Sequence, residues 1–85
     1  MYFPKELYET FQKITDYYKI KWTDSGRSRD DCYYTEWYIG RDNENNEWVA
    51  EFTHWKCPPA YYNLIILRGN ELVISHKIPI STFNC

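Results

Sequence analysis

The sequence predicts an α+β fold in which an N-terminal amphipathic helix packs on one face of a four- or five-stranded antiparallel β-meander, within a single domain of residues 1–85. Three observations lead to this prediction. Apolar residues near the N-terminus recur at helical spacing, aromatic-rich segments separated by turn residues follow, and a two-residue turn near the C-terminus determines how its flanking strands pair.

The helix is expected from about Pro4 to Tyr17. Proline suits the first turn of a helix, because its missing N–H would have no partner there. Leu7, Phe11 and Ile14 then recur at spacings of four and three residues, which places them on one face of the helix. This apolar stripe is the surface that we expect to pack on the sheet.

The pattern changes after the helix. Residues 18–22 alternate between apolar and polar, which predicts a short strand, and residues 24–31 are polar and contain a glycine, which predicts a loop. The aromatic-rich segments 32–39 and 47–55 predict two further strands. Two prolines within residues 57–60 end the second of these, because proline cannot donate a hydrogen bond to a sheet.

The dipeptide Gly69-Asn70 predicts a type II′ hairpin, because glycine in the first position is typical of that turn. It pairs Arg68 with Glu71. Counting along both strands gives the pairs Leu67 with Leu72, Ile65 with Ile74, and Asn63 with His76. If residues 57–60 close the preceding hairpin, the further pairs are Lys56 with Tyr61, His54 with Asn63, Phe52 with Ile65, and Ala50 with Leu67.

These pairs assign the side chains to two faces. The face expected to pack on the helix carries Trp48, Ala50, Phe52, Ile65, Leu67, Leu72, Ile74 and Ile78, joined by Trp37 and Ile39 as the more apolar choice for the first aromatic strand. The opposite face carries the residues that we expect to bind a partner protein: Tyr34, Glu36, Tyr38, Glu51, Trp55, Tyr62 and Arg68. Tyrosine, tryptophan and arginine are enriched in binding hot spots. A competing expectation is that the tail from Pro79 to Cys85 covers part of this face with Ile80 and Phe83.

The composition favours a function without catalysis. Ten basic and twelve acidic residues give a formal charge of −2, and the chain contains no catalytic, phosphate-binding or cofactor motif. The sequence therefore predicts a small non-enzymatic protein-binding module that needs no cofactor. By analogy of size with proteins of phages and bacterial immunity systems, we expect an inhibitor that sterically blocks its partner, and the same face offers a homodimer interface.

Two alternative functions follow from clusters of polar residues. Lys19, Lys21, Arg27 and Arg29, together with exposed aromatic residues, are candidates for binding nucleic acid, although neighbouring aspartates and the overall charge disfavour it. His54, Asn63 and His76 fall in one row of the expected sheet, so a small metal-dependent or acid–base enzyme centred on the two histidines is the other alternative. No residues have zinc-ligand spacing, which disfavours a metal site.

The cysteines and the N-terminus bear on the compartment. Cys32, Cys57 and Cys85 are odd in number and widely spaced, which favours reduced thiols over a disulfide framework. No basic segment followed by an apolar run marks the N-terminus, and no apolar stretch approaches the ~20 residues that span a bilayer. We therefore expect a cytoplasmic protein without membrane contact.

Overall fold

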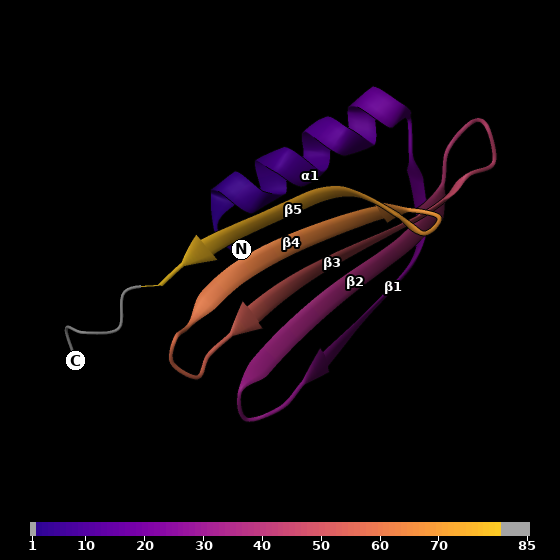
Figure 1. Ribbon diagram of the computed structural model, residues 1–85. Coiled ribbons are helices and arrows are strands. Elements are labelled where there is room, and N and C mark those ends of the chain that lie inside the picture. The colour runs from indigo at the N-terminus through magenta and orange to yellow at the C-terminus, as the bar shows by residue number, and fades with distance from the viewer. Residues whose placement is uncertain (1, 81–85) are drawn as a thin grey trace.

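The computed structural model describes residues 2–80, which form one helix and five strands (Figure 1). The elements in chain order are α1 (Lys5–Tyr18), β1 (Lys21–Arg29), β2 (Tyr33–Arg41), β3 (Glu47–Trp55), β4 (Tyr61–Arg68) and β5 (Glu71–Pro79). The strands form one antiparallel sheet in sequence order, which is a meander. The predicted α+β fold, with a helix packed on a meander, is confirmed.

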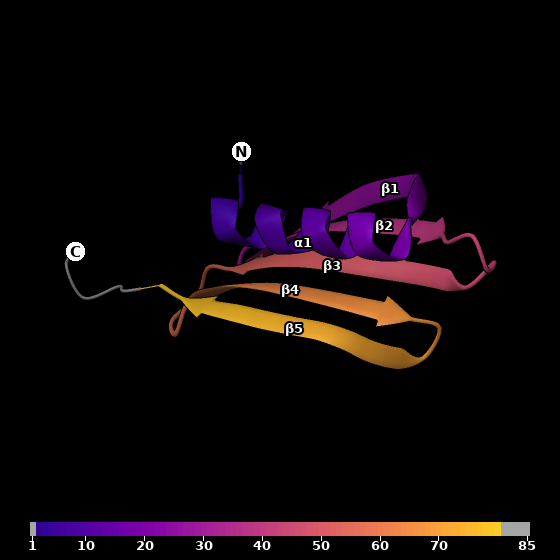
Figure 2. The ribbon, with the colours of Figure 1, turned by 90° about the horizontal axis from the view of Figure 1, so that it is seen from above.

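Helix α1 lies along one face of the sheet (Figure 2). Its apolar stripe faces the strands: Leu7 is fully buried, and Phe11 and Ile14 pack against the core as predicted. The helix ends before Lys19, which adopts a left-handed conformation, and the N–H of Ile20 donates to the carbonyl of Thr15 at 3.0 Å. This is a Schellman-type ending, and it turns the chain into β1.

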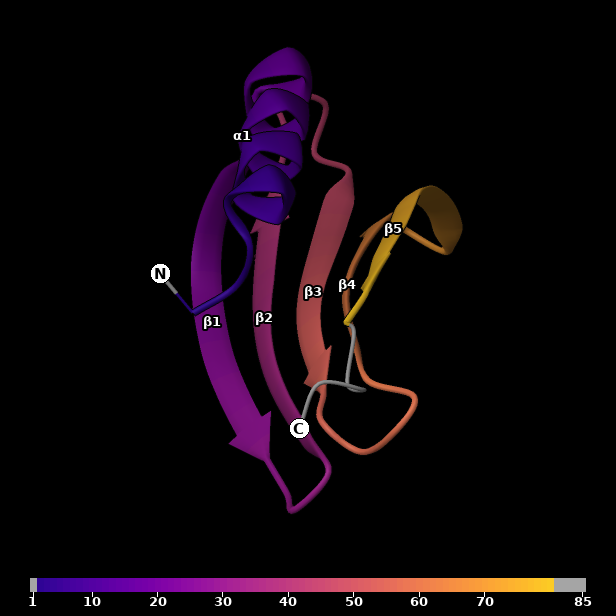
Figure 3. The same ribbon diagram turned by 90° about the vertical axis from the view of Figure 1, so that its left-hand side faces the viewer.

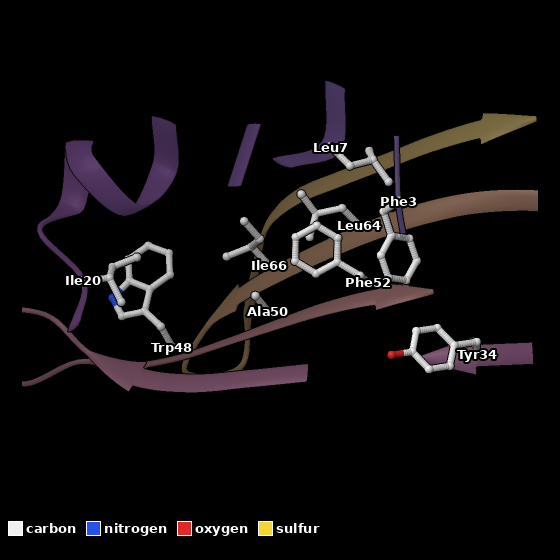
Figure 4. Packing of buried hydrophobic residues seen from close by; sticks show 9 residues of the cluster. All are labelled: Phe3, Leu7, Ile20, Tyr34, Trp48, Ala50, Phe52, Leu64 and Ile66. Atoms are coloured by element: carbon white, nitrogen blue, oxygen red, sulfur yellow. The ribbon is translucent and has the colours of Figure 1, made fainter. Parts of the chain in front are cut away.

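The core lies between α1 and the centre of the sheet. Trp48, Ala50 and Phe52 alternate along β3 and are fully buried, as the sequence predicted. Figure 4 shows Leu64 and Ile66 of β4 beside Phe52, with Leu7 of the helix on the same side of the sheet. Burying a large apolar side chain contributes about 1.5–3 kcal/mol, so this row dominates the stability of a small domain.

The register of β4 differs from the prediction by one residue. The loop before it contains residues 56–60, one more than expected, so that Phe52 pairs with Leu64 instead of Ile65. A one-residue shift exchanges the two faces of a strand. The residues of β4 on the helix side are therefore Tyr62, Leu64, Ile66 and Arg68, and the predicted core positions of Ile65 and Leu67 are wrong.

A bulge in β5 compensates for this shift. The two-residue turn at 69–70 pairs its neighbours as predicted, but the register changes after Leu72, so that Ile74 pairs with Ile66. Ile74 and Ile78 consequently pack against the core as predicted. Leu72, which was expected in the core, is 56% exposed.

Strand β2 presents the opposite face from the one predicted. Gly40 is buried opposite Trp48, and a Cβ at this position would lie 2.2 Å from the carbonyl oxygen of Lys21, so only glycine fits. Alternation from Gly40 determines the faces of the whole strand. Tyr34, Glu36 and Tyr38 lie on the helix side, whereas Trp37 and Ile39 lie on the other side, which corrects both assignments.

Strand β1 occupies the segment that was predicted to be a loop. Residues 24–31 lack apolar side chains, yet most of them belong to the edge strand Lys21–Arg29, of which the predicted strand at 18–22 covers only the beginning. An edge strand with exposed side chains needs no apolar alternation, and polar edges prevent unwanted pairing. Gly26 leaves room for the indole of Trp37, which lies against it.

Candidate functional site

The sheet face opposite α1, which we call the outer face, is the candidate binding surface. Figure 3 shows the helix on one side of the sheet, and within residues 2–80 no helix or strand packs on the other side. The three central strands contribute Tyr33, Thr35, Trp37, Ile39, Val49, Glu51, Thr53, Trp55, Tyr61, Asn63, Ile65 and Leu67 to this face. The tail that was expected to cover it lies, beyond Ile80, outside the described residues.

Three rings cross the outer face near one end of the sheet. Tyr33, Trp55 and Tyr61 occupy paired positions on adjacent strands. The planes of the first two rings differ by 3° with centroids 6.3 Å apart, and those of the last two differ by 20° with centroids 6.5 Å apart. The Nζ of Lys77 lies 4.4 Å from the centroid of Tyr61. We call these three rings the aromatic ladder; such rings offer a large contact area with few rotatable bonds.

A disulfide fixes the end of the sheet that carries the aromatic ladder. Cys32 and Cys57 are bonded, with Cα atoms 5.1 Å apart, and the N–H of Lys56 donates to the carbonyl of Cys32 at 2.6 Å. The prediction of reduced thiols is therefore wrong for these two cysteines, and Cys85 lies outside the described residues. Cysteines separated by 25 residues carry no sequence signal of pairing, because only the register of β2 with β3 brings them together.

Beyond a polar row of Thr35, Thr53 and Asn63, the outer face continues as an apolar strip that carries one carboxylate on its central strand. Glu51 is exposed and pairs with Trp37 on one side and Ile65 on the other. The half-buried apolar residues of this strip are Trp37, Ile39, Val49, Ile65 and Leu67. A surface of this kind can bind apolar side chains and one cation together.

The structure divides the predicted binding residues between the two faces. Glu51 and Trp55 lie on the outer face, as predicted. The other five lie on the helix side: Tyr34, Glu36, Tyr38, Tyr62 and Arg68. The predicted set is therefore not one surface, because β2 and β4 are each turned over relative to the prediction.

Three of these five residues form a small hydrogen-bonded group under the N-terminal segment. The hydroxyl of Tyr34, which is buried, donates to Oε2 of Glu36 at 2.6 Å, and the hydroxyl of Tyr38 donates to Oε1 at 3.4 Å. The bond to the Glu36 carboxylate raises the pKa of Tyr34, and burial raises the pKa of Tyr38. Both phenols therefore stay protonated and hold the carboxylate in place.

The remaining two predicted residues border the core. The ring of Tyr62 stacks on His54 with centroids 4.5 Å apart. Arg68 donates to Glu71 at 3.0 Å, and its guanidinium lies 5.5 Å from the ring of Tyr18. These contacts give both residues a structural role on the helix side.

The predicted histidine row does not form. His54 lies on the helix side with its Nδ1 3.0 Å from the hydroxyl of Tyr2, Asn63 lies on the outer face, and Nε2 of His76 lies 3.1 Å from Glu6 of the helix. Burial lowers the pKa of His54. Among residues 2–80 no three histidine, cysteine or acidic side chains are arranged to hold a metal ion.

The predicted basic cluster is split between the two ends of β1. Lys19 and Lys21 lie at its beginning, where an open hollow also contacts Arg41. Arg27 and Arg29 lie near its end, paired with residues of β2 on the helix side. The four side chains therefore do not form one continuous patch.

The residues of the outer face that the prediction missed have a signal in the sequence. Gly26 and Gly40 are the two glycines inside strands, and each marks a position where a large side chain or a backbone approaches closely. Placing Gly40 opposite the buried Trp48 sends Trp37 and Tyr33 to the outer face.

No protein-family model matches the chain, and neither a curated protein nor a solved structure matches it. In the part of the chain that the structure describes, the helix is too short and too polar to cross a membrane.

Proposed function

We propose that this chain is a non-enzymatic protein-binding module that engages another protein through its outer face and blocks that partner sterically. The observation that carries the proposal is that the aromatic ladder and the apolar strip share one face, with the single row of Thr35, Thr53 and Asn63 between them, and that no other element within residues 2–80 covers this face. Interface centres are rich in tyrosine and tryptophan and poor in charge.

The carboxylate on the outer face indicates which chemical group of the partner lies opposite it. Glu51 is the exposed carboxylate at the centre of the strip, and Trp37 and Ile65 flank it. A partner cation placed there, surrounded by apolar side chains, would form a partly desolvated pair with it. A second copy related by a two-fold axis through this centre would bring two Glu51 carboxylates together, and like charges oppose such contact. A foreign partner is therefore favoured over a homodimer.

The disulfide supports a binding role at this end of the sheet. It ties the β3–β4 loop to the beginning of β2, next to the aromatic ladder, so that the rings are held before a partner arrives. A surface fixed in advance loses less conformational entropy on binding. Because the expectation of a cytoplasmic location depended on reduced thiols, the disulfide removes that argument, since such bonds persist mainly in oxidising compartments.

The proposal is tested by affinity capture with variants of the outer face and a matched control. Trp55→Ala should weaken partner binding by about 2 kcal/mol, which is about 30-fold. Glu51→Arg should also abolish capture, because it places a cation opposite the partner's cation. Tyr17→Ala removes a ring that is 77% exposed on the helix and should leave binding unchanged.

Urea unfolding of each variant separates binding from stability. Trp55→Ala lowers the stability of the domain by removing half-buried area, whereas the exposed Glu51 makes no such contribution. If Glu51→Arg folds normally and still captures the same partner as the wild type, the outer face is not the binding surface. Sedimentation of the pure protein should show a monomer at all concentrations tested.

A further inference from the structure

A second candidate site lies on the helix side of the sheet, away from the outer face. The hairpin ends of β1 and β2 extend beyond the helix (Figure 3). An open hollow of about 390 Å³ lies there, lined by Tyr2, Arg27, Arg29, Tyr34, Glu36 and Lys56. A second hollow of about 340 Å³ adjoins it, shares Arg27 and Glu36, and adds Ser25.

Three cations meet at the first hollow. Arg27 and Arg29 alternate along β1 and so point to the same side, opposite Glu36 and Tyr34 of β2. Lys56 comes from the β3–β4 loop, which the disulfide and the bond from its own N–H to the carbonyl of Cys32 hold in place. Within residues 2–80 none of the three cations forms an ion pair with a carboxylate.

The one carboxylate in the hollow is held by two phenols and keeps free acceptor positions. Glu36 accepts hydrogen bonds from the hydroxyls of Tyr34 and Tyr38, at 2.6 and 3.4 Å. Asp30 and Asp31 belong to the adjoining turn and do not line the hollow. Three cations and one carboxylate leave a net positive charge in a chain whose formal charge is −2, so this local excess favours an anion.

Aromatic rings form one wall of the hollow. The ring of Tyr2 is 48% exposed and lies 4.5 Å, between centroids, from the buried ring of Tyr34. The hydroxyl of Tyr2 is 3.0 Å from Nδ1 of His54, and this contact holds the ring in place. The guanidinium of Arg29 lies 6.0 Å from the centroid of Tyr34. A planar ligand group can stack on such a wall.

We propose that this hollow binds a nucleoside phosphate. The guanidinium groups of Arg27 and Arg29 match the oxygens of a phosphate group in two-point contacts, and Lys56 adds a third positive charge. Glu36, at the junction of the two hollows, accepts hydrogen bonds from sugar hydroxyls, and Tyr2 offers its face to the base. The volume is within the range of small-ligand sites. A phosphotyrosine carries a ring and a phosphate but no hydroxyls for Glu36, which favours the nucleotide.

The test is titration of the purified protein at low salt with AMP, adenosine, inorganic phosphate and a phosphotyrosine peptide, followed by NMR. AMP should bind at least about tenfold more tightly than each of the others, because only AMP engages all parts of the hollow. The double substitution Arg27→Ala and Arg29→Ala should weaken AMP binding by at least about tenfold. The control, Lys19→Ala with Lys21→Ala, removes the same charge from the other end of β1 and should have no effect.

Four outcomes would overturn the proposal: no binding of AMP, equal binding of AMP and inorganic phosphate, equal loss in both double variants, or a preference for the phosphotyrosine peptide. Shift mapping on the wild type keeps the test valid if the arginine variant fails to fold. Perturbed amides should cluster at residues 25–29, 34–36 and 56, and a cluster elsewhere would place the ligand outside the hollow. The outer face is not involved, so neither result depends on the proposed protein binding.

Discussion

Substituting Gly26 by alanine tests the position of Trp37, on which the composition of the outer face depends. A Cβ at Gly26 would lie 2.2 Å from Cζ2 and 2.6 Å from Cε2 of the Trp37 indole, well inside van der Waals contact. The ring must therefore rotate or the two strands must separate. Overpacking of this kind lowers the free energy of unfolding by about 1–3 kcal/mol. Replacing glycine also reduces the conformational freedom of the unfolded chain, which stabilises the fold by about 0.4–1 kcal/mol. We expect a net loss of about 1–2 kcal/mol, or a Tm lower by about 5–15 °C.

The assay is a double-mutant cycle measured by urea unfolding. Trp37→Ala removes the obstacle, so Gly26→Ala should become neutral or slightly stabilising in that background, with a coupling energy of about 1–3 kcal/mol. Gly69→Ala serves as the control. A Cβ at position 69 would meet no atom within 4 Å, but the φ of 60° there is unfavourable for residues other than glycine. The loss of stability from Gly69→Ala should therefore be the same with and without Trp37.

A Gly26→Ala protein that keeps wild-type stability would contradict this reasoning. So would a loss that persists unchanged when Trp37 is alanine. Either result would mean that the indole does not lie against Gly26 of β1, and the assignment of Trp37 to the outer face would be wrong.

Three further predictions test the register, a loop and the disulfide. Leu64→Ala should lower the free energy of unfolding in urea by about 2–5 kcal/mol, and Leu67→Ala should lower it clearly less, because only the Leu64 side chain is fully buried. Equal losses in the two variants would contradict the register of β4. Hydrogen bonds from Trp48 and Asn46 lower the pKa of Asp42 from 3.8 to about 2, so its stabilising effect is present above the unfolded value and is lost as the pH falls from about 4 to 2. Asp42→Asn should flatten this acid limb of the unfolding curve, and parallel curves for the two proteins would refute the assignment. Reducing the disulfide, which closes a loop of 25 residues, should lower the stability by about 3.5 kcal/mol in urea unfolding, and no change on reduction would show that the bond is absent in solution.

The fold could be predicted because its strongest patterns are local. The helical stripe through Leu7 and Phe11 and the turn at 69–70 depend on neighbouring residues. The alternation of β3 was assigned correctly, because Trp48 and Phe52 are the large apolar residues of a strand whose other face is mixed.

The faces of β2 and β4 could not be predicted with the same method, because register depends on counting across loops. One extra residue in the loop 56–60 turned β4 over, and the bulge after Leu72 restored the register for the rest of β5. Aromatic β2 has large side chains on both faces, so hydrophobicity alone does not choose between Tyr38 and Trp37. The choice depends on the close approach of two backbones at Gly40, which is a tertiary contact.

The candidate site was missed in part for the same reason. Trp55 and Glu51 were placed correctly through β3, whereas Tyr33 and Tyr61 depended on the strands on either side. Neither the disulfide nor the polar edge strand β1 has a local signal in the sequence. The disulfide depends on the pairing of β2 with β3, which brings the two cysteines together, and β1 forms because its backbone pairs with that of β2.

Site-specific photocrosslinking tests the central proposal, that the outer face binds a partner protein, most directly. A photoreactive amino acid is incorporated in place of Thr53, on the outer face beside the aromatic ladder, or in place of Lys13, on the exposed side of the helix. After irradiation in an extract of the source cells, the probe at position 53 should form one discrete covalent adduct that excess unlabelled wild-type protein removes, and the probe at position 13 should form none. A competed adduct from position 13 alone would show that the partner binds the helix side and would contradict the account.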